Sequence, residues 1–191
     1  MRLFSKLFLL LSLLAATIVS AETHPFSVHD MLAMDRISDA QVSPDGKTVV
    51  FVVRATDLAA NRGANDLWAV GTDGTGLRRL TSHSAADVNP RWSPDGKTIY
   101  FLSTRSGSSQ LWQISLGGGE ATQVTSFALD VESFRVSPDG TRIAFSAAVF
   151  PGKSIDETAQ MNDAKANQKA SGKIYDSLLF RHWDTWAEGT R

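Results

Sequence analysis

The sequence predicts an all-β fold, a partial β-propeller of four-stranded blades with one inserted surface helix. The tetrapeptide Ser-Pro-Asp-Gly occurs three times, at residues 43–46, 93–96 and 137–140. A Leu-Trp pair also recurs 44 residues apart, at Trp68 and Trp112. Repeats of roughly 40–45 residues are typical of propeller blades, so the period itself indicates the architecture.

The three tetrapeptides have the residues of a type I turn, with serine first, proline second and glycine fourth. A short run rich in β-branched and aromatic residues follows each turn, at residues 48–53, 98–102 and 142–145. These runs are apolar at nearly every position, which is typical of strands covered on both faces. Stacking between neighbouring blades supplies that cover.

Two further markers keep the same 44-residue interval. Leu80-Thr81-Ser82 is repeated as Val124-Thr125-Ser126, and glycine-rich hairpin signals occupy residues 72–76 and 116–119. Each unit therefore contains about four strands. A β-sandwich is the alternative, but three copies of one turn and two copies of three other markers favour the propeller.

The repeats divide the chain into unequal units, because residues 55–65 add six residues to the first. We expect an incomplete propeller domain over residues 22–191. Its parts are blade units at about 39–88, 89–132 and 133–150, a helical insert at 151–172 and the start of a further blade at 173–191.

The insert begins with the capping box Ser154-Ile-Asp-Glu157, followed by residues rich in Ala, Gln, Lys and Asp. We expect a surface helix at about 155–170, with Gly172 as a stop. Residues 173–186 are apolar and aromatic again and resemble an opening strand.

The N-terminus predicts a Sec-type signal peptide over residues 1–21, cleaved after Ala21. Arg2 and Lys6 precede an apolar run at residues 7–19 and a small-residue site. An uncleaved anchor is the alternative, but 13 apolar residues are fewer than the about 20 needed to span a bilayer. We expect a periplasmic or secreted protein that is not membrane-bound after cleavage.

Composition excludes several classes of site. The formal net charge is −1, which gives no electrostatic basis for binding nucleic acid. The chain has no cysteine, so disulfides, thiolate nucleophiles and cysteine metal sites are excluded.

The sequence indicates no catalytic, cofactor or metal residue. Ser109 and Ser154 lack the second glycine of a nucleophile elbow, and we interpret them as loop and helix cap. The histidines, which lack metal-ligand spacing, are His24, His29, His83 and His182.

Other candidates have structural interpretations. Asp45, Asp95 and Asp139 belong to three separate turns and are expected to serve turn chemistry rather than a cation. Residues 117–119 form a hairpin rather than a phosphate-binding loop. The tryptophans at repeat positions, which we assign to the core before any ligand, are Trp68, Trp92 and Trp112.

The Ser-Pro-Asp-Gly-Lys turns and Leu-Trp strands resemble the WD40-like (PD40) repeats of two groups. These are the prolyl-oligopeptidase (S9) family of serine peptidases and the TolB-type periplasmic propellers. The flanking segments at 26–32, 35–46 and 175–186 resemble bacterial dipeptidyl-peptidase and acylaminoacyl-peptidase-like members. TolB-type proteins begin with a separate α/β domain, for which this chain has no room.

The peptidase resemblance implies a C-terminal α/β-hydrolase domain carrying a Ser-Asp-His triad, with the propeller restricting entry to short peptides. No triad residue is carried over, so we expect the chain to be a fragment that is inactive alone. Its partners would be the missing hydrolase domain and short peptide substrates. The alternative is a non-catalytic TolB-like propeller that serves as an interaction module.

Overall fold

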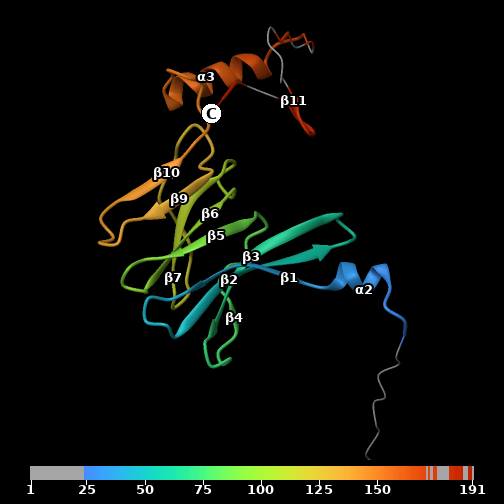
Figure 1. Cartoon of the computed structure of the whole chain (residues 1–191), viewed down its shortest axis with the longest axis vertical. Helices are drawn as coiled ribbons and strands as arrows, with labels where there is room; N and C mark the ends of the chain where they lie inside the picture. The colour runs from blue at the N-terminus through green and yellow to red at the C-terminus, as the bar shows by residue number, and fades with distance from the viewer. Residues whose placement is uncertain (1–23, 171, 173, 176–180, 187–188, 191) are drawn as a thin grey trace, which may run out of the picture. The chain divides into compact units, whose positions relative to one another are not determined.

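The computed structural model describes residues 24–170, 172, 174–175, 181–186 and 189–190. The predicted signal peptide at 1–21 lies outside these residues. Within them, antiparallel sheets dominate, as Figure 1 shows. None of the described helices is long and apolar enough to cross a membrane.

Two sheets have four strands each, paired in chain order. The first contains β1 (Arg36–Val42), β2 (Thr48–Asp57), β3 (Arg62–Gly71) and β4 (Arg78–Arg79). The second contains β5 (Asp87–Trp92), β6 (Thr98–Ser103), β7 (Gln110–Ser115) and β8 (Thr122–Gln123). These two meanders confirm the predicted propeller-like blades.

A third sheet pairs β9 (Ser133–Val136) with β10 (Ile143–Ser146). Near the other end of the chain, β11 (Arg181–His182) and β12 (Thr185–Trp186) form a separate short hairpin. The expected start of a further blade at 173–191 lies partly outside the described residues, at 173, 176–180, 187–188 and 191, and stays a prediction.

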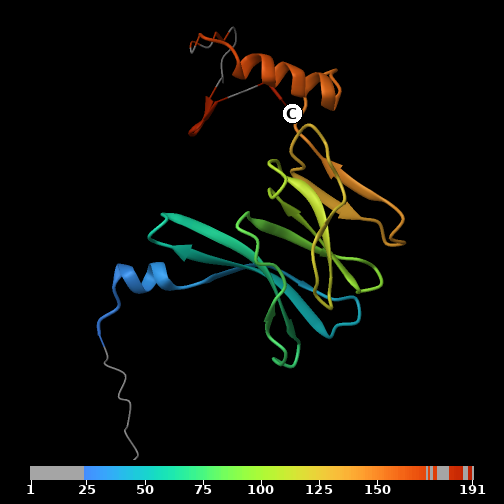
Figure 2. The same cartoon turned by 180° about the vertical axis from the view of Figure 1, so that it is seen from behind.

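The core lies between the sheets. Val50, Val52 and Leu67 of the first sheet pack with Ile99 and Phe101 of the second. On the opposite face of the second sheet, a separate group of buried apolar side chains packs this sheet against β9 and the segment before β9. The group consists of Leu102, Leu111, Val131 and Phe134. Figure 2 shows the third sheet beside the second. The central strands of the second sheet are therefore apolar on both faces because each face contacts a neighbouring blade.

The extra residues of the first unit lengthen one hairpin. Strands β2 and β3 have 10 residues each, whereas β6 and β7 have 6. Pairing continues to Asp57 opposite Arg62, and Asn61 turns the chain with φ +49°. The insertion thus lengthens the two central strands of the blade at one end without changing the strand order.

The predicted insert helix is present as α3 (Ile155–Ala166). Ser154 and Glu157 form the predicted capping box, with Glu157 N–H donating to Ser154 Oγ and Ser154 N–H donating to Glu157 Oε2. The helix ends four residues before the expected 170. Asn167 caps it there, because both its backbone N–H and its side-chain amide donate to Asp163 O.

A short helix near the N-terminus, α2 (Val28–Ala33), is not among the sequence predictions. Ser27 precedes it, and its N–H and hydroxyl both donate to Asp30 Oδ2 at 2.7 Å. These bonds hold the pKa of Asp30 below its ordinary value. A helix of six residues is too short to show a clear hydrophobic period, so the sequence pattern did not reveal it.

Candidate functional site at the inner strands

The first strands of successive blades lie next to one another. Strand β5 contacts β1 on one side and β9 on the other. In a propeller the blades surround a central channel, and first strands that meet in this way form its wall. These strands are therefore the part of the chain best placed to meet a ligand in the channel.

Strands β1 and β5 share a local irregularity. Their pairing shifts register between Ser38 and Gln41 in β1, and between Val88 and Arg91 in β5. Asp39 and Asn89 occupy the bulges in the left-handed region, with φ +47° and +57°. Asp and Asn adopt this conformation more readily than other non-glycine residues, which explains their presence at this repeat position.

An ion pair joins the first two inner strands. Arg91 Nη1 lies 3.0 Å from both carboxylate oxygens of Asp39, and their side chains are 21% and 27% exposed. Gln41 Nε2 also donates to Asp39 Oδ1 at 2.7 Å. From β5 to β1 as well, Trp92 Nε1 donates to Gln41 O at 2.9 Å. The interface between the blades is thus held by polar contacts as well as by the apolar core.

The third inner strand carries an arginine at the same repeat position. Arg135 lies two residues before the third turn, as Arg91 lies two residues before the second. Each guanidinium donates from Nη1 to the carbonyl of the preceding residue, Pro90 at 2.6 Å and Phe134 at 2.9 Å. Both side chains therefore fold back in the same way.

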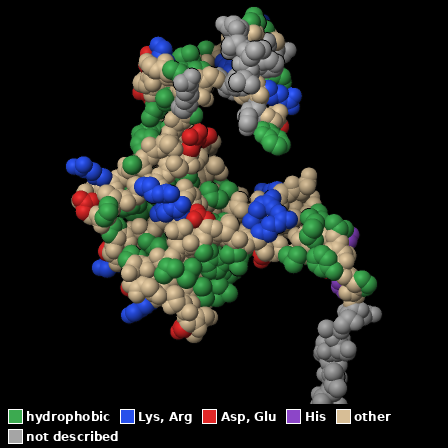
Figure 3. Space-filling model, viewed as in Figure 1, with side chains coloured by type: hydrophobic (Ala, Val, Ile, Leu, Met, Phe, Trp, Pro, Cys, Tyr) green, Lys and Arg blue, Asp and Glu red, His purple; other side chains and the backbone are tan. Residues whose placement is uncertain are grey.

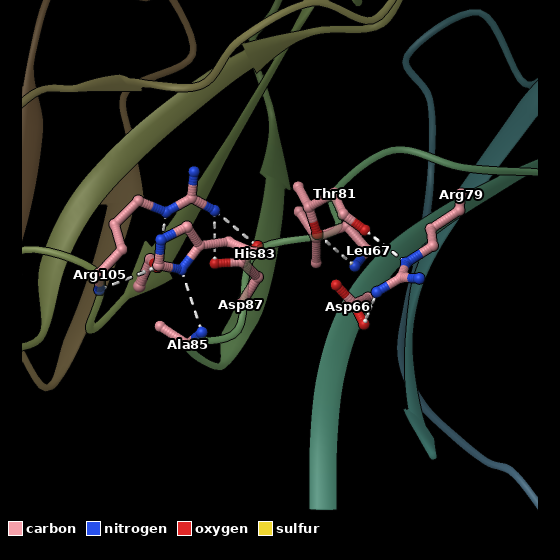
Figure 4. Close-up of polar contacts among 9 residues, drawn as sticks. Asp66, Leu67, Arg79, Thr81, His83, Ala85, Asp87 and Arg105 are labelled. Carbon is pink, nitrogen blue, oxygen red and sulfur yellow. Dashed lines mark hydrogen bonds and ion pairs between the residues drawn. The ribbon is translucent and has the colours of Figure 1, made fainter.

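A second ion pair is buried within the second blade, as Figure 4 shows. Arg105 Nη2 donates to Asp87 at 2.8 and 2.6 Å, and the Asp87 side chain is fully buried. The guanidinium also lies 4.9 Å from the Trp112 ring centre. Burial and aromatic cover hold this arginine firmly, so the pair serves the blade's structure rather than a reaction.

Separate polar contacts lie near this pair. His83 Nδ1 accepts from Ala85 N–H, while Arg79 donates to Asp66 and Leu67 N–H donates to Thr81 Oγ1 (Figure 4). A small cavity of about 220 Å³ lies beside Thr81, His83 and Arg105.

The structure places the two candidate serines in structural roles. Ser109 lies in the loop before β7, where its N–H donates to Asp130 and its hydroxyl to Val131 O. Ser154 caps α3. In the described part of the chain, no group of His, Asp and Glu side chains is arranged to hold a metal ion.

The three turn aspartates have one shared geometry. The carboxylate of Asp45 accepts from Ser43 Oγ at 2.6 Å and from Lys47 N–H at 3.1 Å, and Asp95 and Asp139 repeat this arrangement. The serine hydroxyl lowers the pKa of all three carboxyls, that of Asp139 to about 2. Their partners are within their own turns, as turn chemistry requires.

The remaining sequence candidates lie in the scaffold. Gly118 and Gly119 have positive φ within the turn between β7 and β8, where Gly118 N–H donates to Ser115 O. Trp92 and Trp112 pack against the core, and Trp68 is half-buried opposite Phe51. Asp39, Arg91 and Arg135 were not among the sequence candidates. Arg91 and Arg135 could have been found, because each lies two residues before a Ser-Pro-Asp-Gly turn.

Comparison with known proteins supports the propeller architecture. The family profile described as PD40, TolB beta propeller domain, matches residues 33–172. The apo AtxE2 isopeptidase has a TM-score of 0.58 and 22% identity, over 77% of this chain and 27% of that one. Acylaminoacyl peptidase of Pyrococcus horikoshii has a TM-score of 0.51 and 21% identity, over 65% and 19%. At these identities the structural likenesses show the fold.

Two kinds of relative are similar in sequence. Dipeptidyl-peptidase 5 of Porphyromonas gingivalis is 36% identical over 157 residues, which cover 82% of this chain and 22% of that protein. The Tol-Pal system protein TolB of Anaeromyxobacter dehalogenans is 42% identical over 50 residues, or 26% and 10%. The chain thus matches about a fifth of the length of the peptidase relative.

Proposed function

Because the chain belongs to the PD40 family of TolB beta propeller domains, we propose that it supplies the propeller of an exported serine exopeptidase. In this proposal the propeller admits short peptides to a hydrolase domain that follows it in a longer protein. The chain itself contributes no nucleophile and is inactive alone.

The extent of the peptidase similarity carries this proposal. The match to dipeptidyl-peptidase 5 covers 82% of the chain, whereas the match to TolB covers 26%. Propeller repeats by themselves explain a short match, but a long one also includes the segments around them. This favours a peptidase propeller over the alternative, a TolB-like interaction module.

The inner strands fit a gating role. Their wall combines a partly buried ion pair, Asp39 with Arg91, and the exposed Arg135. Polar groups of this kind can orient the termini and amide groups of a peptide, while the apolar contacts between blades hold the wall in place.

Sequencing the gene past the codon for Arg191, and expressing the longer protein that it encodes, tests the peptidase assignment. We expect the longer protein to react with a fluorophosphonate probe and the 191-residue chain to remain unlabelled. The longer protein should also cleave tetrapeptides much faster than unfolded casein. A stop codon directly after Arg191, or a longer protein that the probe does not label, would refute the proposal and favour the interaction module.

Export has its own test. We expect the expressed protein in the periplasmic fraction or medium with Glu22 as its N-terminal residue, measured by mass spectrometry. A cytoplasmic protein that retains residues 1–21 would contradict the signal peptide and leave the peptidase assignment unaffected.

A further inference from the structure

Two inner strands repeat one basic position, and among the described residues only one of its two copies has an ion pair. Arg91 of β5 pairs with Asp39, which occupies the bulge of the preceding inner strand. For Arg135 the preceding inner strand is β5, and there Asn89 occupies the bulge position equivalent to Asp39. An amide carries no charge, so it cannot neutralise a guanidinium as Asp39 does.

Arg135 is held in position but lacks an acid. Its Nη1 donates to Phe134 O, which matches the bond from Arg91 to Pro90 O. Within the described residues, no carboxylate lies at ion-pair distance from Arg135, and its side chain is exposed. A guanidinium has five N–H donors and favours carboxylates. The other donors of Arg135 can therefore bind an external carboxylate.

We propose that Arg135 binds a carboxylate group of a peptide at the inner wall. Relative to Arg135, this carboxylate takes the place that Asp39 takes relative to Arg91. This inference takes the identity of the ligand as a short peptide from the proposed function. The carboxylate comes either from the C-terminus of the peptide or from an acidic side chain, and the two sources have the same chemistry.

Surrounding charges favour this assignment. The inner wall has two arginines at equivalent positions, Arg91 and Arg135, and Asp39 of the first inner strand pairs with Arg91. On the face viewed in Figure 3, basic side chains form several separate groups. Arg135, which makes no ion pair among the described residues, therefore provides the selectivity at this position.

Three acetylated peptides test the proposal on the isotope-labelled 191-residue chain. They are trialanine with a free carboxylate, trialanine amide, and Ala-Glu-Ala amide. NMR titration follows the Nε–H signal of Arg135. We expect at least one carboxylate peptide to bind about fivefold more tightly than the neutral amide, a gain typical of an exposed ion pair. The peptide that does so identifies the source of the carboxylate.

Matched variants separate this site from general attraction. Arg135→Gln should abolish the preference for carboxylate. Asn89→Asp should also abolish it by supplying the missing internal acid, since Asp39 shows that aspartate fits this bulge. Arg62→Gln removes an exposed charge from β3 and should leave the preference intact. An overlay of amide spectra verifies that each variant is folded.

The proposal is overturned if the wild-type chain does not distinguish carboxylate from amide, which includes binding neither. It is also overturned if Arg135→Gln keeps the preference. Either result leaves the peptidase assignment standing, because that assignment depends on probe labelling of the longer protein.

Discussion

Pro44 in the first Ser-Pro-Asp-Gly turn packs against Gly96 in the second. A Cβ atom built on Gly96 would lie 3.4 Å from Pro44 Cδ, and one built on Gly140 would lie 3.5 Å from Pro94 Cδ. The turns of successive blades therefore stack, with the proline of one on the glycine of the next. The repeated tetrapeptide thus serves the contact between blades as well as the turn within each blade.

This stacking predicts that a large side chain at Gly96 is more harmful than one at Gly46. Both glycines have the same turn position and similar φ, +69° and +72°, but a Cβ added at Gly46 would meet no atom within 4 Å. Replacing either by leucine should cost about 1–2 kcal/mol in backbone strain. Gly96→Leu should lose up to about 1 kcal/mol more, because the leucine side chain must displace the exposed Pro44 ring. Urea unfolding measures both, and equal losses would contradict the stacking.

The buried ion pair in the second blade predicts a large loss when one partner is removed. Arg105→Ala leaves the Asp87 carboxylate buried without its partner and should lower the free energy of unfolding by about 3–5 kcal/mol. Arg91→Ala, whose pair with Asp39 is partly exposed, should cost only about 1 kcal/mol. Similar losses for the two variants would show that Asp87 is hydrated after all.

The repeated threonine predicts a role for its hydroxyl. Thr125 Oγ1 accepts from Leu111 N–H at 2.9 Å and donates to the buried Gln110 at 2.8 Å. Thr125→Val keeps the shape but removes both bonds, and should cost about 1–3 kcal/mol. Thr122→Val, at an exposed position in β8, is the control. Thermal unfolding that is unchanged in Thr125→Val would exclude this role.

The turn aspartates predict loss of stability in acid. Hydrogen bonds lower the pKa of folded Asp139 to about 2, below the about 3.9 of an unfolded aspartate. The folded state is therefore favoured by the ionised group above pH 3.9, and this advantage disappears as the pH falls toward 2. Asp139→Asn should unfold more easily at pH 7 and lose less between pH 5 and pH 2.5.

Asp35→Asn, at an exposed carboxyl with no hydrogen bond among the described residues, serves as the control for this pH series. It should follow the wild-type curve. If Asp139→Asn also followed that curve, the turn carboxylate would not contribute to acid sensitivity.

Local chemistry explains why much of the fold follows from the sequence. In each turn the serine hydroxyl donates to an aspartate two residues away and accepts from an N–H five residues away. The capping box of α3 spans three residues. Such bonds close between near neighbours whatever the rest of the chain does, so the pattern of residue types predicts them. The 44-residue period then predicts the stacking of blades, because each copy needs cover on both faces.

Contacts between blades were decided only by the tertiary structure. Asp39 and Arg91 are 52 residues apart, and their pairing depends on a bulge in each strand and on how two sheets meet. The burial of Asp87 with Arg105 likewise depends on how β5 and β6 pair within their blade. By itself the sequence determined the repeated units and their turns. The inner wall comes from the packing of those units, because distances across a sheet interface are not encoded in local spacing. Among the described residues, that packing gives Arg91 an acid partner and Arg135 none.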